Sequence, residues 1–213
     1  RCFFFWCRVM RMFKLYLLVL ASCFLPQLAQ ARLAMPSSAS DGARVFAGVR
    51  PAVVALRTSL IDSEQRNSSG SGFQVDARGW TITNFQVGGD YLFDPARYRL
   101  HYETAGGGQG EAEVIAIDVL HDLALVAPRK PLPKGDARPL ALPTHGTIHR
   151  LAKGEAIYAV GNPLDLGMTV SAGTYSGVVE GTFVERIHFT GVLNPGMSGG
   201  PALDRTGSVV GIN

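Results

Sequence analysis

The stretch GMSGGP at residues 196–201 is the most informative part of this chain. Its serine, Ser198, lies between glycines, which let the backbone turn tightly and let neighbouring N–H groups converge on one point. A cradle of that kind stabilises the oxyanion that develops during acyl transfer. Taken alone the pattern is weak, because a serine among glycines is most often part of a flexible turn. Its meaning therefore depends on the segments that precede it.

Short apolar segments separated by glycine make up most of the chain, and all 25 glycines lie after residue 41. The segments are rich in Val, Ile, Thr and aromatic residues, which is typical of strands. One set lies before the proline-rich stretch 128–143 and a second set lies after it. The predicted strands are 52–56, 72–75, 80–83, 98–102, 112–117, 123–126, 156–160, 169–179, 186–190, 201–203 and 208–212. A short helix is predicted from Ser40 or Asp41 to Val49, where Pro51 ends it. Two clusters of short strands predict two antiparallel barrels or sandwiches.

Five motifs resemble, in order and spacing, those of the trypsin-like serine proteases of the HtrA/Deg class. The motifs are GSGF (70–73), TNFQV (83–87), DLAL (122–125), GNP (161–163) and NPGMSGG (194–200). The resemblance covers roughly residues 42–213. It implies an all-β fold of two perpendicular, antiparallel six-stranded β-barrels, with a catalytic cleft and a Ser–His–Asp triad between them.

The resemblance also assigns roles to single residues. Ser198 takes the position of the nucleophile, and Asp122 takes that of the acid that orients the histidine. Gly196, Met197 and Ser198 would form the oxyanion hole, with the N–H groups of Gly196 and Ser198 as donors and Met197 between them.

The position of the catalytic histidine holds Gln86. An amide has no titratable lone pair near neutral pH, so it cannot take the serine proton and return it to the leaving amine. Loss of the triad base in a comparable enzyme lowers turnover by about 10⁶-fold. We therefore expect a protease homologue that is catalytically dead or severely impaired and that binds polypeptide without cleaving it. The alternative is an active serine endopeptidase that uses another base, or one in which residue 86 is recorded wrongly.

Five histidines are candidates for a replacement base: His101, His121, His145, His149 and His188. The first and last lie in predicted strands, and the third and fourth follow the proline-rich stretch. His121 adjoins Asp122, but neighbouring side chains of an extended segment point to opposite faces. We expect all five to be surface or packing histidines. We also expect no cofactor and no metal, since no cysteine follows residue 31.

Two positions before Ser198 bear on substrate choice. The residue eight before it, commonly Asp in this class, is Thr190, and the residue six before it is Val192, where a trypsin-type pocket places its acid. A cationic side chain would find no partner there. We expect a pocket for a small apolar residue of an unfolded or extended polypeptide.

The first 31 residues differ from the rest of the chain. They hold four of the 20 basic residues, all three cysteines and no acid, so the formal charge of +3 leaves a body of net charge −1. That balance argues against a nucleic-acid partner. A basic run, the apolar run 15–26 and the small residues at 29–31 predict a signal peptide that ends at Ala31. We expect export to the periplasm; anchoring as a lipoprotein through Cys23 is the alternative.

The sequence predicts five regions. They are a signal peptide at 1–31, an N-terminal segment with a short helix at 32–50, a first barrel at 51–127, a proline-rich linker at 128–150 and a second barrel at 151–213. If Met10 or Met12 is the start of the protein, residues 1–9 are upstream translation. The family continues beyond the final predicted strand, so we expect a truncated C-terminus and a second barrel without its closing strands. The resemblance further implies a homo-oligomer.

Overall fold

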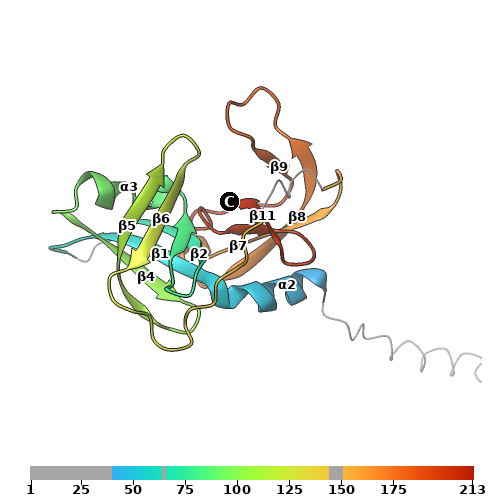
Figure 1. Ribbon diagram of the computed structural model, residues 1–213. Coiled ribbons are helices and arrows are strands. Elements are labelled where there is room, and N and C mark those ends of the chain that lie inside the picture. The colour runs from blue at the N-terminus through green and yellow to red at the C-terminus, as the bar shows by residue number, and fades with distance from the viewer. Residues whose placement is uncertain (1–39, 64–65, 144–150) are drawn as a thin grey trace, which may run out of the picture. The chain divides into compact units, whose positions relative to one another are not determined.

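The computed structural model describes residues 40–63, 66–143 and 151–213 (Figure 1). Ser40–Asn213 forms one compact unit, which contains the fold. The predicted signal peptide with Cys23, and both His145 and His149, lie outside the described residues. Within the described ranges, no helix is long and apolar enough to cross a membrane.

The first set of predicted strands forms a closed antiparallel barrel (Figure 1). Its strands are β1 (Val53–Leu60), β2 (Arg66–Gln74), β3 (Thr81–Thr83), β4 (Tyr98–Thr104), β5 (Gln109–Asp118) and β6 (Leu123–Pro128). They follow the order β1-β2-β3-β6-β5-β4, and β4 pairs with β1 to close the barrel. Alternate side chains such as Val54, Leu56, Leu100 and Val126 fill the interior, as the two-residue period of a strand requires.

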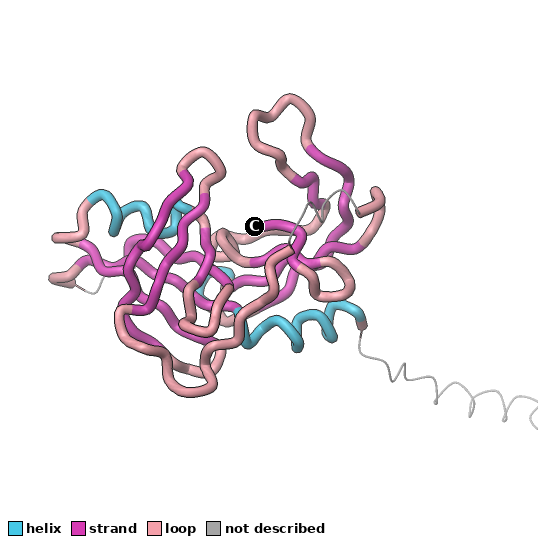
Figure 2. The backbone as a smooth tube through the Cα atoms, in the orientation of Figure 1, coloured by secondary structure: helices cyan, strands magenta, loops and turns pink. Residues whose placement is uncertain are grey.

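The second set forms a curled five-stranded sheet in the order β11-β10-β7-β8-β9. Its strands are β7 (Ala156–Gly161), β8 (Thr169–Val178), β9 (Ile187–Phe189), β10 (Pro201–Leu203) and β11 (Val209–Ile212), and the 3-10 turn η3 (Pro163–Asp165) follows β7. Both sheets are drawn in magenta in Figure 2. The architecture confirms the predicted trypsin-like double barrel, with the second barrel incomplete.

The N-terminal helix α2 (Asp41–Val49) is also confirmed. The Ser40 hydroxyl caps it by accepting the N–H of Ala43 at 3.2 Å, which satisfies one free donor of the first turn. The 3-10 turn η1 (Arg50–Ala52) follows the helix. Val45 and Val49 are buried in a cluster that also takes in Val53 of β1 and Val160 of β7. The helix therefore packs where residues of both sheets meet.

Helix α3 (Phe85–Phe93) was not predicted from the sequence. It contains the adjacent glycines Gly88 and Gly89, and each glycine lowers helix propensity by about 1 kcal/mol relative to Ala. Both glycines are buried, so tertiary packing overrides this local preference. The helix matters for function because Gln86 lies in its first turn.

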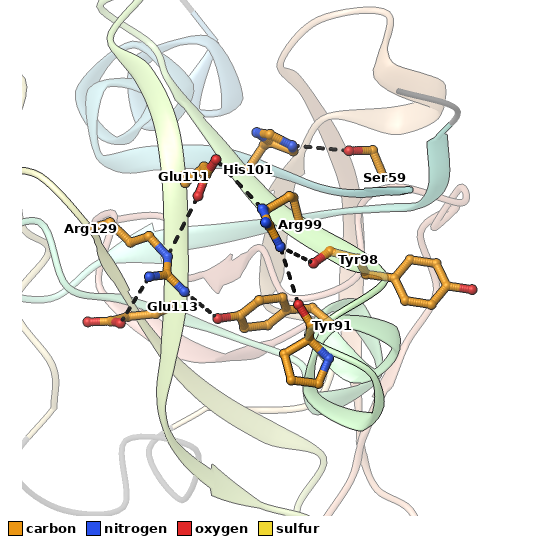
Figure 3. Close-up of polar contacts among 9 residues, drawn as sticks. Ser59, Tyr91, Tyr98, Arg99, His101, Glu111, Glu113 and Arg129 are labelled. Carbon is orange, nitrogen blue, oxygen red and sulfur yellow. Dashed lines mark hydrogen bonds and ion pairs between the residues drawn. The ribbon is translucent and has the colours of Figure 1, made fainter. Parts of the chain in front are cut away.

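A polar network ties α3 to the barrel wall (Figure 3). Arg129, just after β6, donates from Nη2 to the Tyr91 hydroxyl of α3 at 2.8 Å. Its guanidinium also lies 3.8 Å from a carboxylate oxygen of Glu111 and 4.0 Å from one of Glu113. The bond to Tyr91, followed by the nearby charges, raises the pKa of Arg129. Arg99 reaches the other oxygen of Glu111 at 3.9 Å.

The described part of the proline-rich stretch is fixed against the closed barrel. Gln74, at the end of β2, is almost fully buried. Its carbonyl accepts the N–H of Leu140 at 2.9 Å, and its side-chain amide donates to the Asp136 carbonyl at 3.1 Å. The Asp136 carboxylate accepts the Thr104 hydroxyl at 2.9 Å. Residues 136–140 are thus held by the barrel and do not form a loose connection.

Candidate active site

A cleft of about 740 Å³ is lined by residues of the closed barrel and of the second sheet. Gln86 and Asp122 line it from the first, and Ser198 lines it from the loop before β10. The three residues at the predicted triad positions therefore share one cavity, although they lie far apart in the sequence. Part of the cleft is apolar, with Ile157, Ala159, Ala202 and Val210 among its lining residues.

Asp122 anchors the first turn of α3. Its carboxylate Oδ1 accepts the backbone N–H of Gln86 at 3.0 Å, and its carbonyl accepts the N–H of Phe85 at 3.1 Å. The Asn84 side-chain amide donates to the same carbonyl at 3.0 Å. A negative charge at a helix N-terminus is favourable, because the free N–H groups there carry partial positive charge. These bonds between segments 36 residues apart fix the position of the Gln86 backbone.

Asp122 holds this position with a left-handed backbone, at φ 53°. Few residues other than glycine adopt such angles; Asp and Asn do so more readily than most. Asn84 has an ordinary extended backbone. Its side-chain Oδ1, however, is buried and has no hydrogen-bond partner among the described residues. Both features lie on the wall of the cleft.

The side chain of Gln86 is exposed in the cleft. Within the described ranges neither its amide nor the Ser198 hydroxyl has a hydrogen-bond partner. The site thus contains a serine hydroxyl, a carboxylate held against a helix N-terminus and a neutral amide. No imidazole stands at residue 86 to take a proton from the serine.

Two carbonyl groups before Ser198 accept hydrogen bonds from donors of other segments. The Pro195 carbonyl accepts the N–H of Leu164 in η3 at 2.9 Å. The Gly196 carbonyl accepts the Ser71 hydroxyl of β2 at 2.7 Å. In a trans peptide the C=O and N–H point in opposite directions. The N–H of Gly196 therefore points away from the Leu164 contact.

The N–H groups around Ser198 fall into two kinds. The N–H of Met197 donates to the Asn194 carbonyl at 3.0 Å and is occupied within its own turn. The N–H groups of Gly196 and Ser198 have no acceptor in the described part of the chain. Met197 itself is fully buried. Two free donors thus flank a buried residue, which is the arrangement of an oxyanion-binding nest.

The glycines on either side of Ser198 are required by geometry. Gly196 has φ +94°, and a Cβ there would lie 2.5 Å from the Asn162 carbonyl oxygen. Gly199 has φ +85°, and its Cβ would collide with the Ser71 carbonyl. Larger residues at these two positions would displace the loop that carries Ser198 from its neighbours. The GMSGG pattern therefore follows from close packing of this loop against β2 and the end of β7.

Residues 70–212 match the family model described as "Trypsin-like peptidase domain". The chain belongs to this family. It is 36% identical over 183 residues to "Serine protease HTR4" of Rattus norvegicus, covering 80% of this chain and 35% of the relative. It is 33% identical over 160 residues to "Protease Do-like 1, chloroplastic" of Arabidopsis thaliana, covering 70% and 34%.

A bacterial relative and a solved structure place the peptidase domain in the HtrA/Deg class. The "Probable periplasmic serine endoprotease DegP-like" of Brucella suis is 31% identical over 154 residues, covering 70% of this chain and 28% of the relative. The crystal structure of Deg5 superposes with a TM-score of 0.67 at 25% identity, covering 81% of this chain and 83% of that one. The chain spans about a third of the length of the curated relatives it matches.

Two expected pocket residues of this trypsin-like domain do not line the cleft. Val192 is 67% exposed. The Thr190 hydroxyl is hydrogen-bonded elsewhere, because it accepts the N–H of Thr174 at 2.8 Å. Leu193 and Phe189 line the cleft in their place. Neither position carries an acid, although Glu185 is among the residues that line the cleft, and the apolar contacts come from Phe189 and Leu193.

Contrary to the expectation from the sequence, His121 does not lie in an extended segment. Residues 119–122 form a turn, so His121 and Asp122 do not alternate as in a strand, and both line the cleft. The ring Nδ1 of His121 lies 2.7 Å from one oxygen of Asp118, and its backbone N–H donates to the other at 3.1 Å. These bonds lower the pKa of Asp118, the backbone N–H most and the ring next. A carboxylate at Nδ1 leaves Nε2 as the free ring nitrogen.

The other described histidines lie elsewhere. His101 of β4 pairs through Nε2 with the Ser59 hydroxyl at 3.1 Å (Figure 3), and His188 is exposed on β9. Neither lines the cleft. In the described ranges, no group of three or more His, Cys, Asp or Glu side chains could hold a metal ion.

Proposed function

We propose that this HtrA/Deg-class serine protease homologue binds extended polypeptide in its cleft and does not cleave it. One observation carries the proposal. Gln86 occupies the first turn of α3, with its N–H on the Asp122 carboxylate and its side chain in the cleft that Ser198 also lines. A base at this place is needed to accept the serine proton. An amide at residue 86 keeps the cleft intact, but peptide cleavage then lacks a group that accepts the serine proton.

The remaining parts of the machinery support binding. Ser198 stands at the nucleophile position and Asp122 at that of the orienting acid, and the free N–H groups of Gly196 and Ser198 are available to a carbonyl oxygen. Such donors hold the carbonyl oxygen of a bound peptide and, in an active enzyme, the oxyanion that it becomes. The apolar lining suits a polypeptide segment with exposed apolar side chains.

We further propose that the protein acts after export. The apolar run before Ala31 and the periplasmic naming of a Brucella suis relative support this. Periplasmic release after cleavage at Ala31 is favoured over anchoring through Cys23, because the Phe-Leu-Pro that follows this cysteine is unusual for a lipidated N-terminus. A homo-oligomer is proposed by similarity to the class.

A second candidate function is active proteolysis with His121 as the base. The observation that favours it is the Asp118–His121 pair: Nδ1 of His121, which lines the cleft, lies 2.7 Å from the Asp118 carboxylate, as in the carboxylate–imidazole contact of a triad. In this reading Asp122 only anchors α3. The two candidates differ in one measurable property, the reactivity of Ser198 in the native chain.

The deciding experiment is the rate at which a fluorophosphonate probe labels Ser198. We expect the native chain to react more slowly than Gln86→His by several orders of magnitude, with an upper limit of about 10⁶-fold. Ser198→Ala is the blank, and binding of an unfolded, reduced protein substrate should be equal in the native chain and in Ser198→Ala. Labelling of the native chain as fast as Gln86→His, together with cleavage of that substrate, would overturn the proposal. A folded Gln86→His protein that does not react would show that the triad positions are assigned wrongly.

A further inference from the structure

Ser71 is a fully buried serine of β2 that contacts the nucleophile loop from the opposite barrel. Its hydroxyl donates to the Gly196 carbonyl at 2.7 Å and accepts the N–H of Asn162 at 2.9 Å. Its own N–H donates to the Ser198 carbonyl at 2.8 Å. A single residue therefore holds two carbonyl groups of the loop that carries the nucleophile.

The direction of the Ser71 hydroxyl proton is fixed by these partners. A serine hydroxyl has one donor and two acceptor lone pairs, and its proton normally rotates to suit the surroundings. Here the N–H of Asn162 occupies an acceptor site, and the Gly196 carbonyl can only accept. The hydroxyl proton must therefore point at Gly196. The peptide between Gly196 and Met197 is held in one orientation from across the barrel interface.

We propose that Ser71 is a positioning residue for the oxyanion nest. The inference rests on the assignment of Gly196 and Ser198 as oxyanion donors. Without the Ser71 hydroxyl, the Gly196 carbonyl would be a buried acceptor with no partner. Because glycine imposes little restriction on its own torsions, the Gly196–Met197 peptide would then rotate to find another donor. Such a rotation would break the bond from the Met197 N–H to the Asn194 carbonyl and would shift the Gly196 and Ser198 N–H groups that flank this peptide.

The surroundings of Ser71 oppose any other response. Thr83 of β3 donates its hydroxyl to the Ser71 carbonyl at 2.6 Å. On the other side, Gly199 approaches that carbonyl so closely that it could not carry a Cβ. Ser71 is thus held on both sides, so loss of its hydroxyl would act on the Gly196–Met197 peptide, whose remaining bond runs from the Met197 N–H to the Asn194 carbonyl within the same turn. The hydroxyl acts on the donors through this peptide and does not itself reach the cleft.

The test separates chemistry from binding. In the full chain with Gln86→His, a peptidyl fluorophosphonate gives the inhibitor affinity KI and the maximal labelling rate kinact, because its phosphoryl oxygen takes the place of the oxyanion. We expect Ser71→Ala to lower kinact by about 10²-fold, as for loss of one oxyanion donor, and to leave KI within about twofold. The matched control is Thr58→Val, which removes another fully buried hydroxyl of the same barrel, bonded to Ser68. It should leave both constants unchanged.

Other outcomes decide against Ser71. An unchanged kinact, or an equal fall in Thr58→Val, would show that the hydroxyl has only a structural role. If Ser71→Ala does not fold, Ser71→Cys retains a weak donor and should give an intermediate kinact; a parental value would overturn the inference.

A second readout does not depend on the triad assignment. In the native chain we expect Ser71→Ala to shift the carbonyl ¹³C resonance of Gly196 and to speed exchange of the Met197 N–H. An unchanged spectrum would refute the proposal for Ser71. Failure of Gln86→His to react would instead refute the proposed function and leave this spectral test standing.

Discussion

The carboxylate of Asp122 binds the backbone of Gln86: its Oδ1 accepts that N–H at 3.0 Å, while the Gln86 side chain lies exposed in the cleft. The acid at the triad position thus has a structural task that is independent of the residue at position 86. It holds the first turn of α3 and the turn 119–122 together. This framework depends on the backbone of residue 86 and not on its side chain.

Asp122→Asn should separate the structural task of this acid from the catalytic one. The amide oxygen of Asn can still accept the N–H of Gln86, and Asn tolerates the left-handed backbone. We therefore expect little change in melting temperature, whereas Asp122→Ala should lower stability by about 1–2 kcal/mol through loss of the cap. In the Gln86→His background, Asp122→Asn should slow labelling of Ser198 by about 10⁴-fold. Equal destabilisation by Asn and Ala would contradict this separation.

Gly196→Ala should destabilise the fold more than the same change at another glycine of similar backbone. Gly107 is the matched control, because it has φ +87° and nothing within 4 Å of a built Cβ. A left-handed alanine costs about 1–2 kcal/mol, and both variants carry that term. Only Gly196→Ala also places a methyl group 2.5 Å from the Asn162 carbonyl oxygen. Chemical denaturation should show the larger loss at Gly196; equal losses would mean that the loop moves aside freely.

Most of the fold could be predicted from the chain, because most strands contain a short apolar run closed by glycine or a polar turn; the polar first part of β2, residues 66–71, lacks that signal. On β1 the run Val53–Leu56 is apolar and buried throughout, so the sequence predicts the strand but does not show that Val54 and Leu56 are the residues that face the barrel interior. Helix α3 could not be predicted, since Gly88 and Gly89 argue against a helix and only burial against the barrel offsets them.

In the candidate site, too, some features could be predicted from the sequence and others could not. The motifs located Ser198, Asp122 and Gln86, which the structure brings to one cleft. The expectation that His121 points away from Asp122 assumes an extended segment, and residues 119–122 form a turn instead. The contact between Ser71 and Gly196 joins residues 125 positions apart, so no local pattern in the sequence predicts it.

Tyr91→Phe should weaken the attachment of α3 to the barrel. The change removes the hydroxyl that accepts from Arg129 at 2.8 Å, and a hydrogen bond to a charged group contributes about 1.5–3 kcal/mol at most when shielded from water. Because the Arg129 side chain is half exposed, solvent screens this bond, and we expect only a small fall in melting temperature. Tyr98→Phe is the control, because within the described residues the Tyr98 hydroxyl has no hydrogen bond. Thermal unfolding of both variants measures the difference, and equal melting temperatures would show that the Arg129 bond adds nothing.

The Asp118–His121 pair predicts a specific pH dependence. Hydrogen bonds from the His121 backbone N–H, and then from its ring, lower the pKa of Asp118 below its ordinary value of 3.8. A depressed carboxyl pKa stabilises the folded state at pH values above the unfolded pKa, and that contribution is lost as the pH falls through the folded pKa. The turn should therefore loosen only in acid, below about pH 4. A ¹³C titration of the Asp118 carboxyl measures the midpoint directly, and a midpoint at or above 3.8 would contradict the geometry.

His121→Ala then tests both the titration and the second candidate function. The backbone N–H of residue 121 remains, so we expect the Asp118 midpoint to rise toward 3.8 without losing the whole shift. His188→Ala is the matched control, since His188 is an exposed histidine that does not line the cleft. If His121 serves as the base, slow labelling of Ser198 in the native chain falls further in His121→Ala and stays constant in His188→Ala. Equal labelling of all three proteins, with the expected rise of the Asp118 midpoint, means that the pair shapes the turn and that the cleft has no base, as the amide at residue 86 predicts.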